Sequence, residues 1–233
     1  MVSRGVRRVS TIADALCLAR VALRIEFRTR AALAAAALLG GLVLLLGALA
    51  AGPDAGRLRA LAPGLVALAT AFIAVAVGDR LDHIDHEQDV FSALWLLVGD
   101  RRALFLGRTA ALAVLLMGLQ VVLWALAAAL LDVSVAAVLS IIVAAAMLTA
   151  VAASAAAVLA VTLSTRTIHQ TLLLPVVLLP LLVPTLLASI GANDAALGGR
   201  PGDALAPLAL TGIQAALFVG LGLLTYEAGA APE

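Results

Sequence analysis

Long uncharged runs alternate with short polar stretches along the chain. A helix needs about 20 apolar residues to cross a hydrocarbon core about 30 Å thick. Six runs reach that length without Asp, Glu, Lys or Arg: Ala31–Ala51, Ala60–Gly78, Thr109–Leu131, Val133–Thr165, Thr167–Asn193 and Ala204–Tyr226. They predict six membrane-spanning helices, and within the last three runs we place the helices at about 136–163, 171–192 and 206–226.

The composition supports an all-α membrane protein. Of the 233 residues, 64% are hydrophobic and 12% are charged. A soluble domain is about half apolar and a quarter charged, so a water-soluble enzyme is excluded. The first run is 21 residues long and follows a 30-residue arginine-rich lead. That length predicts a true span, because the apolar core of a signal peptide has only about 7–15 residues.

The basic residues predict the orientation of the bundle. All 15 are arginine, and 12 of them fall in the N-terminal 30 residues, in segment 79–108 or at Arg166. The opposite side has only Arg57, Arg59 and Arg200. Because cytoplasmic loops carry the excess of positive charge, we expect both termini and segment 79–108 to lie in the cytoplasm of a bacterial inner membrane.

The chain lacks the residues of several common chemistries. Without lysine it cannot form the phosphate-binding P-loop, and a single cysteine, Cys17, excludes an internal disulfide. No nucleophile motif and no lipid-headgroup transferase motif is present, so we expect no catalytic residues. The six runs contain no Asp, Glu or Arg, and their one histidine, His169, falls at a predicted cytoplasmic end. If the protein transports a solute, its energy therefore comes from another subunit; the alternative is a scaffold that transports nothing.

Three prolines interrupt the fifth predicted span, at Pro175, Pro180 and Pro184. Each removes one backbone hydrogen bond and clashes with the preceding turn. In hydrocarbon the freed carbonyls need partners, so we expect a kinked helix at the bundle centre or lining a pathway. Ordinary proline enrichment in membrane helices is the alternative.

The N-terminal 30 residues predict an amphipathic helix. Apolar residues recur every three or four positions, at Ile12, Leu16, Ala19, Leu23 and Phe27. Beside this stripe stands a row of arginines, Arg20, Arg24 and Arg28. Such a helix suits the headgroup layer of a membrane. A helix that packs on a partner subunit and a purely topological arginine cluster are the two alternatives.

An acidic stretch follows the second predicted span. Its charged residues include Asp79, Arg80, Asp82, Asp85, Glu87 and Asp89. One interpretation is a short polar helix that docks onto a cytoplasmic partner. A second is a metal site built from His83, His86 and the carboxylates, although no fixed ligand pattern such as HExxH is present. The third is a solvated acidic loop.

The order of several short motifs resembles one family. Ala62-Pro63-Gly64 opens the second predicted span and Asp79-Arg80-Leu81 closes it. The fifth span has the Pro-x-x-x-Pro spacing at Pro180 and Pro184, followed by a predicted small-residue turn at Ala188–Asp194. With six spans and one acidic loop, the chain resembles the haem exporter protein B (CcmB) family. After Asp89 it departs from the family's pattern of Gly and then Leu-Glu.

The resemblance implies an ABC-2-type exporter permease of the cytochrome c maturation system. It implies a separate ATPase subunit, which would grip the stretch Asp79–Asp89, and a haem-handling membrane partner. We expect a homodimer or hetero-oligomer in the lipid bilayer, with haem as a transported or handled species and no cofactor of its own. No feature predicts nucleic-acid binding. The alternatives are a general exporter permease for another apolar substrate and a non-transporting assembly scaffold.

Overall fold

A computed structural model describes residues 15–20, 23, 30–131, 133, 135–164 and 170–228, with the backbone alone at 30–32, 79, 81–87, 101, 163–164, 170–174 and 228. Within these ranges six long α-helices are present: α2 (Arg30–Ala51), α3 (Ala55–Glu87), α5 (Arg101–Leu130), α6 (Leu139–Ser164), α7 (Gln170–Leu197) and α8 (Leu205–Ala228). Single turns of 3-10 helix, η1 (Ala136–Val138) and η2 (Pro201–Ala204), precede α6 and α8. All six long helices are long and apolar enough to cross a membrane, which confirms the predicted fold class.

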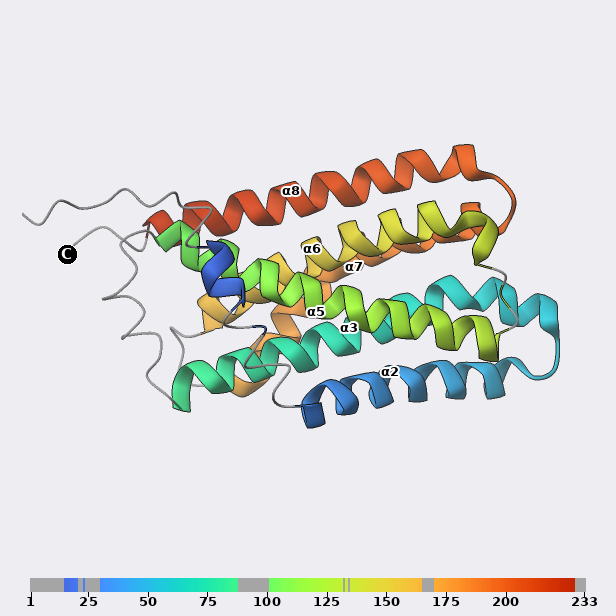
Figure 1. The fold of residues 1–233 in the computed structure, drawn as a ribbon, viewed down its shortest axis with the longest axis horizontal. Helices are drawn as coiled ribbons and strands as arrows, with labels where there is room; N and C mark the ends of the chain where they lie inside the picture. Colours follow the sequence, from blue (N-terminus) through green and yellow to red (C-terminus); the bar gives the residue numbers. More distant parts are fainter. Residues whose placement is uncertain are drawn as a thin grey trace, which may run out of the picture.

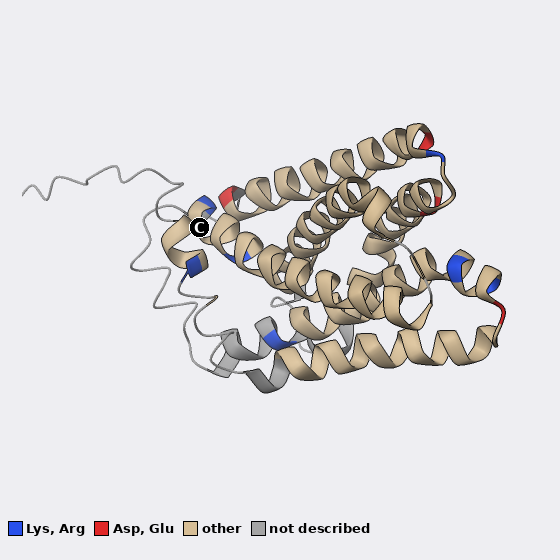
Figure 2. Cartoon of the chain, turned by 45° about the vertical axis from the view of Figure 1, so that its right-hand side comes forward, with Lys and Arg blue, Asp and Glu red and all other residues tan. Residues whose placement is uncertain are grey.

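Successive helices run in opposite directions along one elongated bundle (Figure 1). The bundle therefore has two distinct ends. One end holds the last turn of α8 and the first turn of α5, and we call it the carboxy-terminal end. The other holds the α2–α3 and α7–α8 connections, and we call it the turn end. Charged residues gather toward these two ends and leave the middle of the bundle uncharged (Figure 2).

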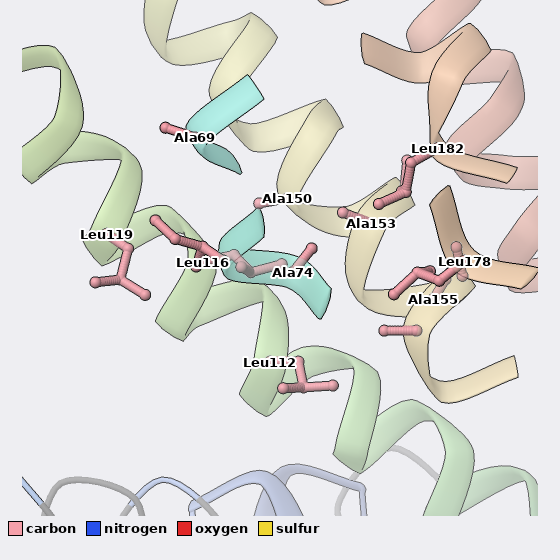
Figure 3. Packing of buried hydrophobic residues seen from close by; sticks show 14 of the residues in the cluster. Ala69, Ala74, Leu112, Leu116, Leu119, Ala150, Ala153, Ala155, Leu178 and Leu182 are labelled. Atoms are coloured by element: carbon pink, nitrogen blue, oxygen red, sulfur yellow. The ribbon is translucent and has the colours of Figure 1, made fainter. Parts of the chain in front are cut away.

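Helix α6 lies at the centre of the bundle and packs against α3, α5, α7 and α8. Every residue from Ala152 to Val161 is buried. Most of these side chains are alanines, and small side chains let neighbouring backbones approach closely. Leu178 and Leu182 of α7 lie against the alanine surface of α6 (Figure 3), and both are fully buried.

Helix α7, expected at the bundle centre or lining a pathway, packs against α3, α6 and α8. Helix α7 contains Pro175, Pro180 and Pro184 within one continuous helix. One face of α7 packs on its neighbours, but its opposite face is open to the surroundings, with Val176 exposed to 69% and Leu187 to 62%. The alanine-rich α6 takes the central place because its small side chains allow several helices to surround it. A pathway-lining role for α7 stays a prediction.

Helix α3 starts earlier and ends later than the second predicted span. Gly52 adopts a left-handed conformation (φ 73°), and the Asp54 side chain accepts hydrogen bonds from the backbone N–H groups of Gly56 (2.9 Å) and Arg57 (3.3 Å). This side-chain cap, of a kind worth about 1 kcal/mol, starts the helix at Ala55. Ala62-Pro63-Gly64 therefore lies inside α3 and does not open it, which corrects the sequence prediction.

The predicted turn at Ala188–Asp194 is also wrong, because α7 stays helical to Leu197. The helix ends where Gly199 adopts a left-handed conformation (φ 74°). The N–H of Gly199 donates to the carbonyl of Ala196 (3.2 Å), and the N–H of Arg200 donates to that of Ala195 (2.9 Å). These two bonds form a Schellman motif, which requires a residue without a Cβ penalty at its left-handed position. Two consecutive glycines, not the small residues before them, determine where the helix ends.

Candidate functional site at the carboxy-terminal end

The acidic stretch forms a helical extension of α3. Because α3 is continuous to Glu87, it continues for nine residues beyond Gly78, where its apolar span ends. At 1.5 Å per residue this extension is about 13 Å long. Helix α5 begins at Arg101, so the described parts of the predicted cytoplasmic segment 79–108 are helical at both of its ends. Residues 88–100, with the predicted coupling residue Asp89, lie outside the described residues.

The backbone places the predicted coupling residues Asp79, Asp82, Asp85 and Glu87 on this extension. Because α3 is one continuous helix, a displacement of its end near Glu87 would also displace its membrane-spanning part. The helix packs against α2, α5, α6 and α7. The metal alternative at His83 and His86 stays a prediction, because their side chains are outside the described set. The described side chains contain no group of three potential metal ligands.

Arg80, another predicted coupling residue, is half-buried. It lines a cavity of about 350 Å³ between α2, α3 and α5. The rest of the described lining is apolar: Leu33, Ala35, Ala36, Leu39, Ala76, Val77 and Leu115.

An aromatic side chain joins α5 to α8 at the same end. The Phe105 ring is fully buried, and a Cβ placed on Gly222 would overlap the far edge of that ring, its Cζ, Cε1 and Cε2 atoms. The ring also packs on Tyr226 of α8, with the two ring centroids 5.3 Å apart and the planes tilted by 52°. Aromatic pairs in such tilted geometry contribute about 0.5–1.5 kcal/mol beyond the apolar area that they bury. Gly222 is therefore required for the close approach of α5 and α8.

Polar contacts surround this aromatic pair. The Thr162 hydroxyl of α6 donates to the carbonyl of Val158 (2.7 Å) and lies 3.3 Å from the Tyr226 hydroxyl. Arg102, at the first turn of α5, forms an ion pair with Glu227 at the last turn of α8. We call the set Arg102, Phe105, Thr162, Gly222, Tyr226 and Glu227 the terminal clasp. It joins α5, α6 and α8 at the end of the bundle that holds the acidic extension.

A part of the N-terminal region packs beside the clasp. Residues 15–20 are helical, and Ala15 and Ala19 are buried. A Cβ placed on Gly107 of α5 would lie 2.9 Å from the Leu18 Cβ and 3.0 Å from the Ala15 carbonyl oxygen. The segment therefore contacts α5 almost backbone to backbone. Of the predicted apolar stripe, Ala19 is buried, Leu23 is half-buried and Leu16 is 62% exposed, while Ile12 and Phe27 lie outside the described residues.

Unpaired polar atoms lie deep inside the bundle. The hydroxyls of Thr149 on α6 and Thr185 on α7 are buried without a hydrogen-bond partner, as is the side-chain carbonyl oxygen of Gln214 on α8. Burying such a group without a partner costs about 1–3 kcal/mol. Sequence reasoning considered only ionisable groups in the spans and therefore missed these neutral ones.

Packing contacts between the three helices place these atoms at one depth. A Cβ on Gly212 of α8 would lie 3.9 Å from Leu148 of α6, and a Cβ on Gly191 of α7 would lie 3.5 Å from Pro207 of α8. Helices α6 and α8 run in the same direction and α7 runs in the opposite one (Figure 1). Counted from these two contacts, the positions of Thr149, Thr185 and Gln214 along the bundle axis differ by about one residue, or about 1.5 Å. The middle of the α6–α7–α8 group therefore holds a layer of unpaired neutral polar atoms.

Sequence reasoning also missed the terminal clasp. Phe105 falls in the predicted cytoplasmic segment 79–108, and Gly222 looks like an ordinary small residue of the sixth predicted span, 117 positions away. The only signal was the charge of Glu227 directly after the sixth run and of Arg102 shortly before the third, since opposite charges at one end of a bundle can pair.

One protein family matches nearly the whole chain. The family model described as CcmB protein matches residues 13–232. The match includes the docked N-terminal segment, all six long helices, the acidic extension and the terminal clasp. The comparison with curated proteins found no match.

Proposed function

Because this chain belongs to the CcmB family, membrane permease subunits of the cytochrome c maturation ABC transporter, we propose that it forms the membrane part of an exporter driven by a separate ATP-binding subunit. The family match over residues 13–232 is the observation that carries the proposal. The sequence is consistent with it, because a chain without lysine has no P-loop of its own. The exporter would act in cytochrome c maturation, by haem export or by release of a haem chaperone.

The acidic extension of α3 is the proposed contact with the ATPase. The backbone of Asp82, Asp85 and Glu87 lies beyond the apolar part of α3 but within the same helix. A movement imposed on this extension would enter the bundle through α3. It would reach α7 by direct packing, since α3 and α7 are in contact. The proline-containing α7 would take part in the rearrangement, because each proline leaves one carbonyl without its helical partner.

Movement of the acidic extension could also reach α8, through α5 and the terminal clasp. Helix α3, which bears the acidic extension, packs directly against α5. The clasp then ties the first turns of α5 to the last turn of α8. A displacement at the carboxy-terminal end would therefore move α3, α5 and α8 together. In this proposal that end faces the cytoplasm of the bacterial inner membrane, because Arg80 follows the apolar span of α3 and Arg102 and Arg108 lie in the first turns of α5.

Reversing the acidic charges tests the proposed contact. The triple variant Asp82→Lys, Asp85→Lys, Glu87→Lys should insert into membranes normally but fail to stimulate ATP hydrolysis by its partner subunit. The matched control, Asp194→Lys with Asp203→Lys, reverses two exposed carboxylates at the turn end and should leave stimulation unchanged. Normal stimulation by the triple variant would contradict the coupling role.

Haem is the proposed cargo of the complex, and we assign no haem-binding residue to this chain. A tryptophan-rich haem-handling membrane subunit would supply that contact, within a homodimeric or hetero-oligomeric assembly. Two alternatives make different predictions. A general exporter permease would purify with an ATPase but without a haem-handling partner. An assembly scaffold would support cytochrome c maturation even when the partner's ATPase is inactive.

A further inference from the structure

The unpaired polar layer, formed by Thr149, Thr185 and Gln214, lies at mid-depth of the bundle. Thr149 and Gln214 are the central residues of the apolar spans of α6 and α8, and Thr185 is next to the central residue of the span of α7. Each of the three side chains has a buried polar atom without a hydrogen-bond partner among the described residues. At the centre of a bilayer such an atom is costly, because hydrocarbon offers it no partner.

Thr149 and Thr185 lie on facing sides of α6 and α7. Leu182 of α7 packs on the alanine surface of α6, close to Ala153 (Figure 3). The two helices run in opposite directions (Figure 1), so about one turn toward the turn end leads from Ala153 to Thr149 and from Leu182 to Thr185. Both threonines are buried. A hydroxyl can donate and accept, so the two side chains are chemically able to pair.

Gln214 lies on the face of α8 that is turned to α7. A Cβ on Gly191 of α7 would lie 3.5 Å from Pro207 of α8, so the two helices meet there. Gln214 follows Pro207 by about two turns and therefore falls on nearly the same face of α8. Its unpaired atom is the side-chain carbonyl oxygen. This oxygen only accepts, so the partner that it lacks is a donor such as a threonine hydroxyl.

A groove between α7 and α8 begins at the level of the polar layer. Its volume is about 640 Å³, and it extends from Pro184 of α7 toward the turn end, where Ala206 of α8 lines it. Ala188 and Gly191 contribute further small side chains to its lining. Small residues allow two membrane helices to approach closely. Helix α7 therefore has room to move toward α8 beside the layer.

Two prolines weaken α7 at the same level. Pro184 lacks the N–H that would bond to the carbonyl of Pro180, and Pro180 lacks the one that would bond to the carbonyl of Val176. Both prolines are exposed, so they lie on the face of α7 that no described helix covers. A bend at these two turns is therefore not blocked by the packing of α7 on its neighbours.

We propose that α7 bends at Pro180 and Pro184, closes the groove against α8 and pairs the polar layer in a second state of the bundle. In that state the Thr149 hydroxyl donates to the Thr185 hydroxyl oxygen, and the Thr185 hydroxyl donates to the side-chain carbonyl oxygen of Gln214. All three atoms then have partners, and the structure described here is the open state. The proposal concerns this chain alone and does not depend on the cargo or on the partner subunits.

Disulfide trapping of the purified full-length chain in phosphatidylglycerol nanodiscs tests the proposal. In a Cys17→Ser background, Leu187→Cys and Leu210→Cys place one thiol on each side of the groove. A disulfide requires the two Cα atoms to come within about 7 Å, so its rate of formation under a mild oxidant reports closure. The disulfide should form in this parent chain. Thr185→Val, which removes both proposed hydrogen bonds and keeps the side-chain shape, should slow it about tenfold.

Two control variants isolate the role of the Thr185 hydroxyl. Thr185→Ser keeps the hydroxyl and should trap at the parent rate. Thr225→Val on α8 removes a hydroxyl that donates to the Leu221 carbonyl of its own helix at 2.8 Å, and it should also trap at the parent rate.

Three results would overturn the proposal. If the parent chain forms no disulfide, the groove does not close. If Thr185→Val traps at the parent rate, the polar layer does not stabilise the closed state. If Thr185→Ser is slowed as much as Thr185→Val, the hydroxyl is not the cause of the difference.

Discussion

The Phe105 ring of α5 occupies the space where a side chain on Gly222 of α8 would begin. The ring is fully buried, and it also packs on Tyr226, one turn further along α8. The two helices are therefore as close as a glycine allows. This contact lies at the end of the bundle that holds the proposed coupling surface, so its integrity should affect both stability and transport.

The first prediction concerns this contact. Gly222→Ala should lower the free energy of unfolding by about 1–3 kcal/mol, because the added methyl group overpacks a rigid buried ring. Gly220→Ala on the same helix is the matched control, since a Cβ there would meet nothing within 4 Å. Thermal unfolding of both variants in mild detergent measures the difference. Equal melting temperatures would contradict the close approach.

The ion pair of the terminal clasp should contribute much less. Arg102 and Glu227 are 53% and 41% exposed, and exposed pairs are worth about 0–1 kcal/mol. Glu227→Gln should therefore lower the melting temperature less than Gly222→Ala does, and high salt should reduce the effect further. A larger loss than that of Gly222→Ala would show that the pair, not the aromatic contact, holds the clasp together.

The sequence predicted the helices well and their ends poorly. Uncharged runs determine which segments cross a bilayer, because an ionised group is costly there. The ends depend on local backbone geometry, such as the side-chain cap at Asp54 and the left-handed Gly199, which hydropathy does not report. For the acidic extension of α3 the sequence left a polar helix and a solvated loop open, because charge marks the end of a span and not the end of a helix.

The clasp and the unpaired polar layer could not be predicted for a different reason. Each depends on which helices are neighbours. A single sequence does not indicate that residues as far apart as Phe105 and Gly222 are in contact. The central position of α6 is similar. Only the three-dimensional arrangement shows that α6 packs against four other long helices, α3, α5, α7 and α8.

A third prediction concerns the docked N-terminal segment. Gly107→Ala should displace residues 15–20 from α5, because the new methyl group would meet the Ala15 carbonyl oxygen. In a Cys17→Ser background, a cysteine introduced by Ala19→Cys would be protected from a maleimide when the segment is docked, since Ala19 is only 6% exposed. Adding Gly107→Ala should make labelling faster.

Gly118→Ala is the control for that experiment, because a Cβ at Gly118 would meet nothing within 4 Å. Labelling of the Ala19→Cys thiol should then stay slow. If Gly107→Ala leaves the labelling rate unchanged, residues 15–20 do not dock on this part of α5.

A fourth prediction concerns the unpaired polar layer. Thr185→Val should raise the free energy of unfolding by about 1 kcal/mol, because it removes a buried hydroxyl without a partner and keeps the side-chain shape. Thr70→Val should be destabilising instead, since the Thr70 hydroxyl donates to the Val66 carbonyl at 2.8 Å. Paired thermal-unfolding curves compare the two. A loss of stability in Thr185→Val equal to that in Thr70→Val would mean that the Thr185 hydroxyl has a partner.

If Thr185→Val is more stable and also loses transport activity, the hydroxyl serves a functional state in which it gains a partner. An ordered water molecule or a rearranged neighbouring helix would supply one. Unchanged transport would leave this hydroxyl without a role in the transport cycle.

The most direct test of the central claim is to identify what this chain binds in its native membrane. Affinity purification of the tagged full-length chain in mild detergent, followed by mass spectrometry, would identify the partners. The proposed function predicts an ABC ATPase subunit together with a tryptophan-rich haem-handling membrane protein, and loss of the ATPase from the Asp82→Lys, Asp85→Lys, Glu87→Lys variant. A well-folded preparation that contains neither partner would contradict the assignment as an ATP-driven permease of cytochrome c maturation.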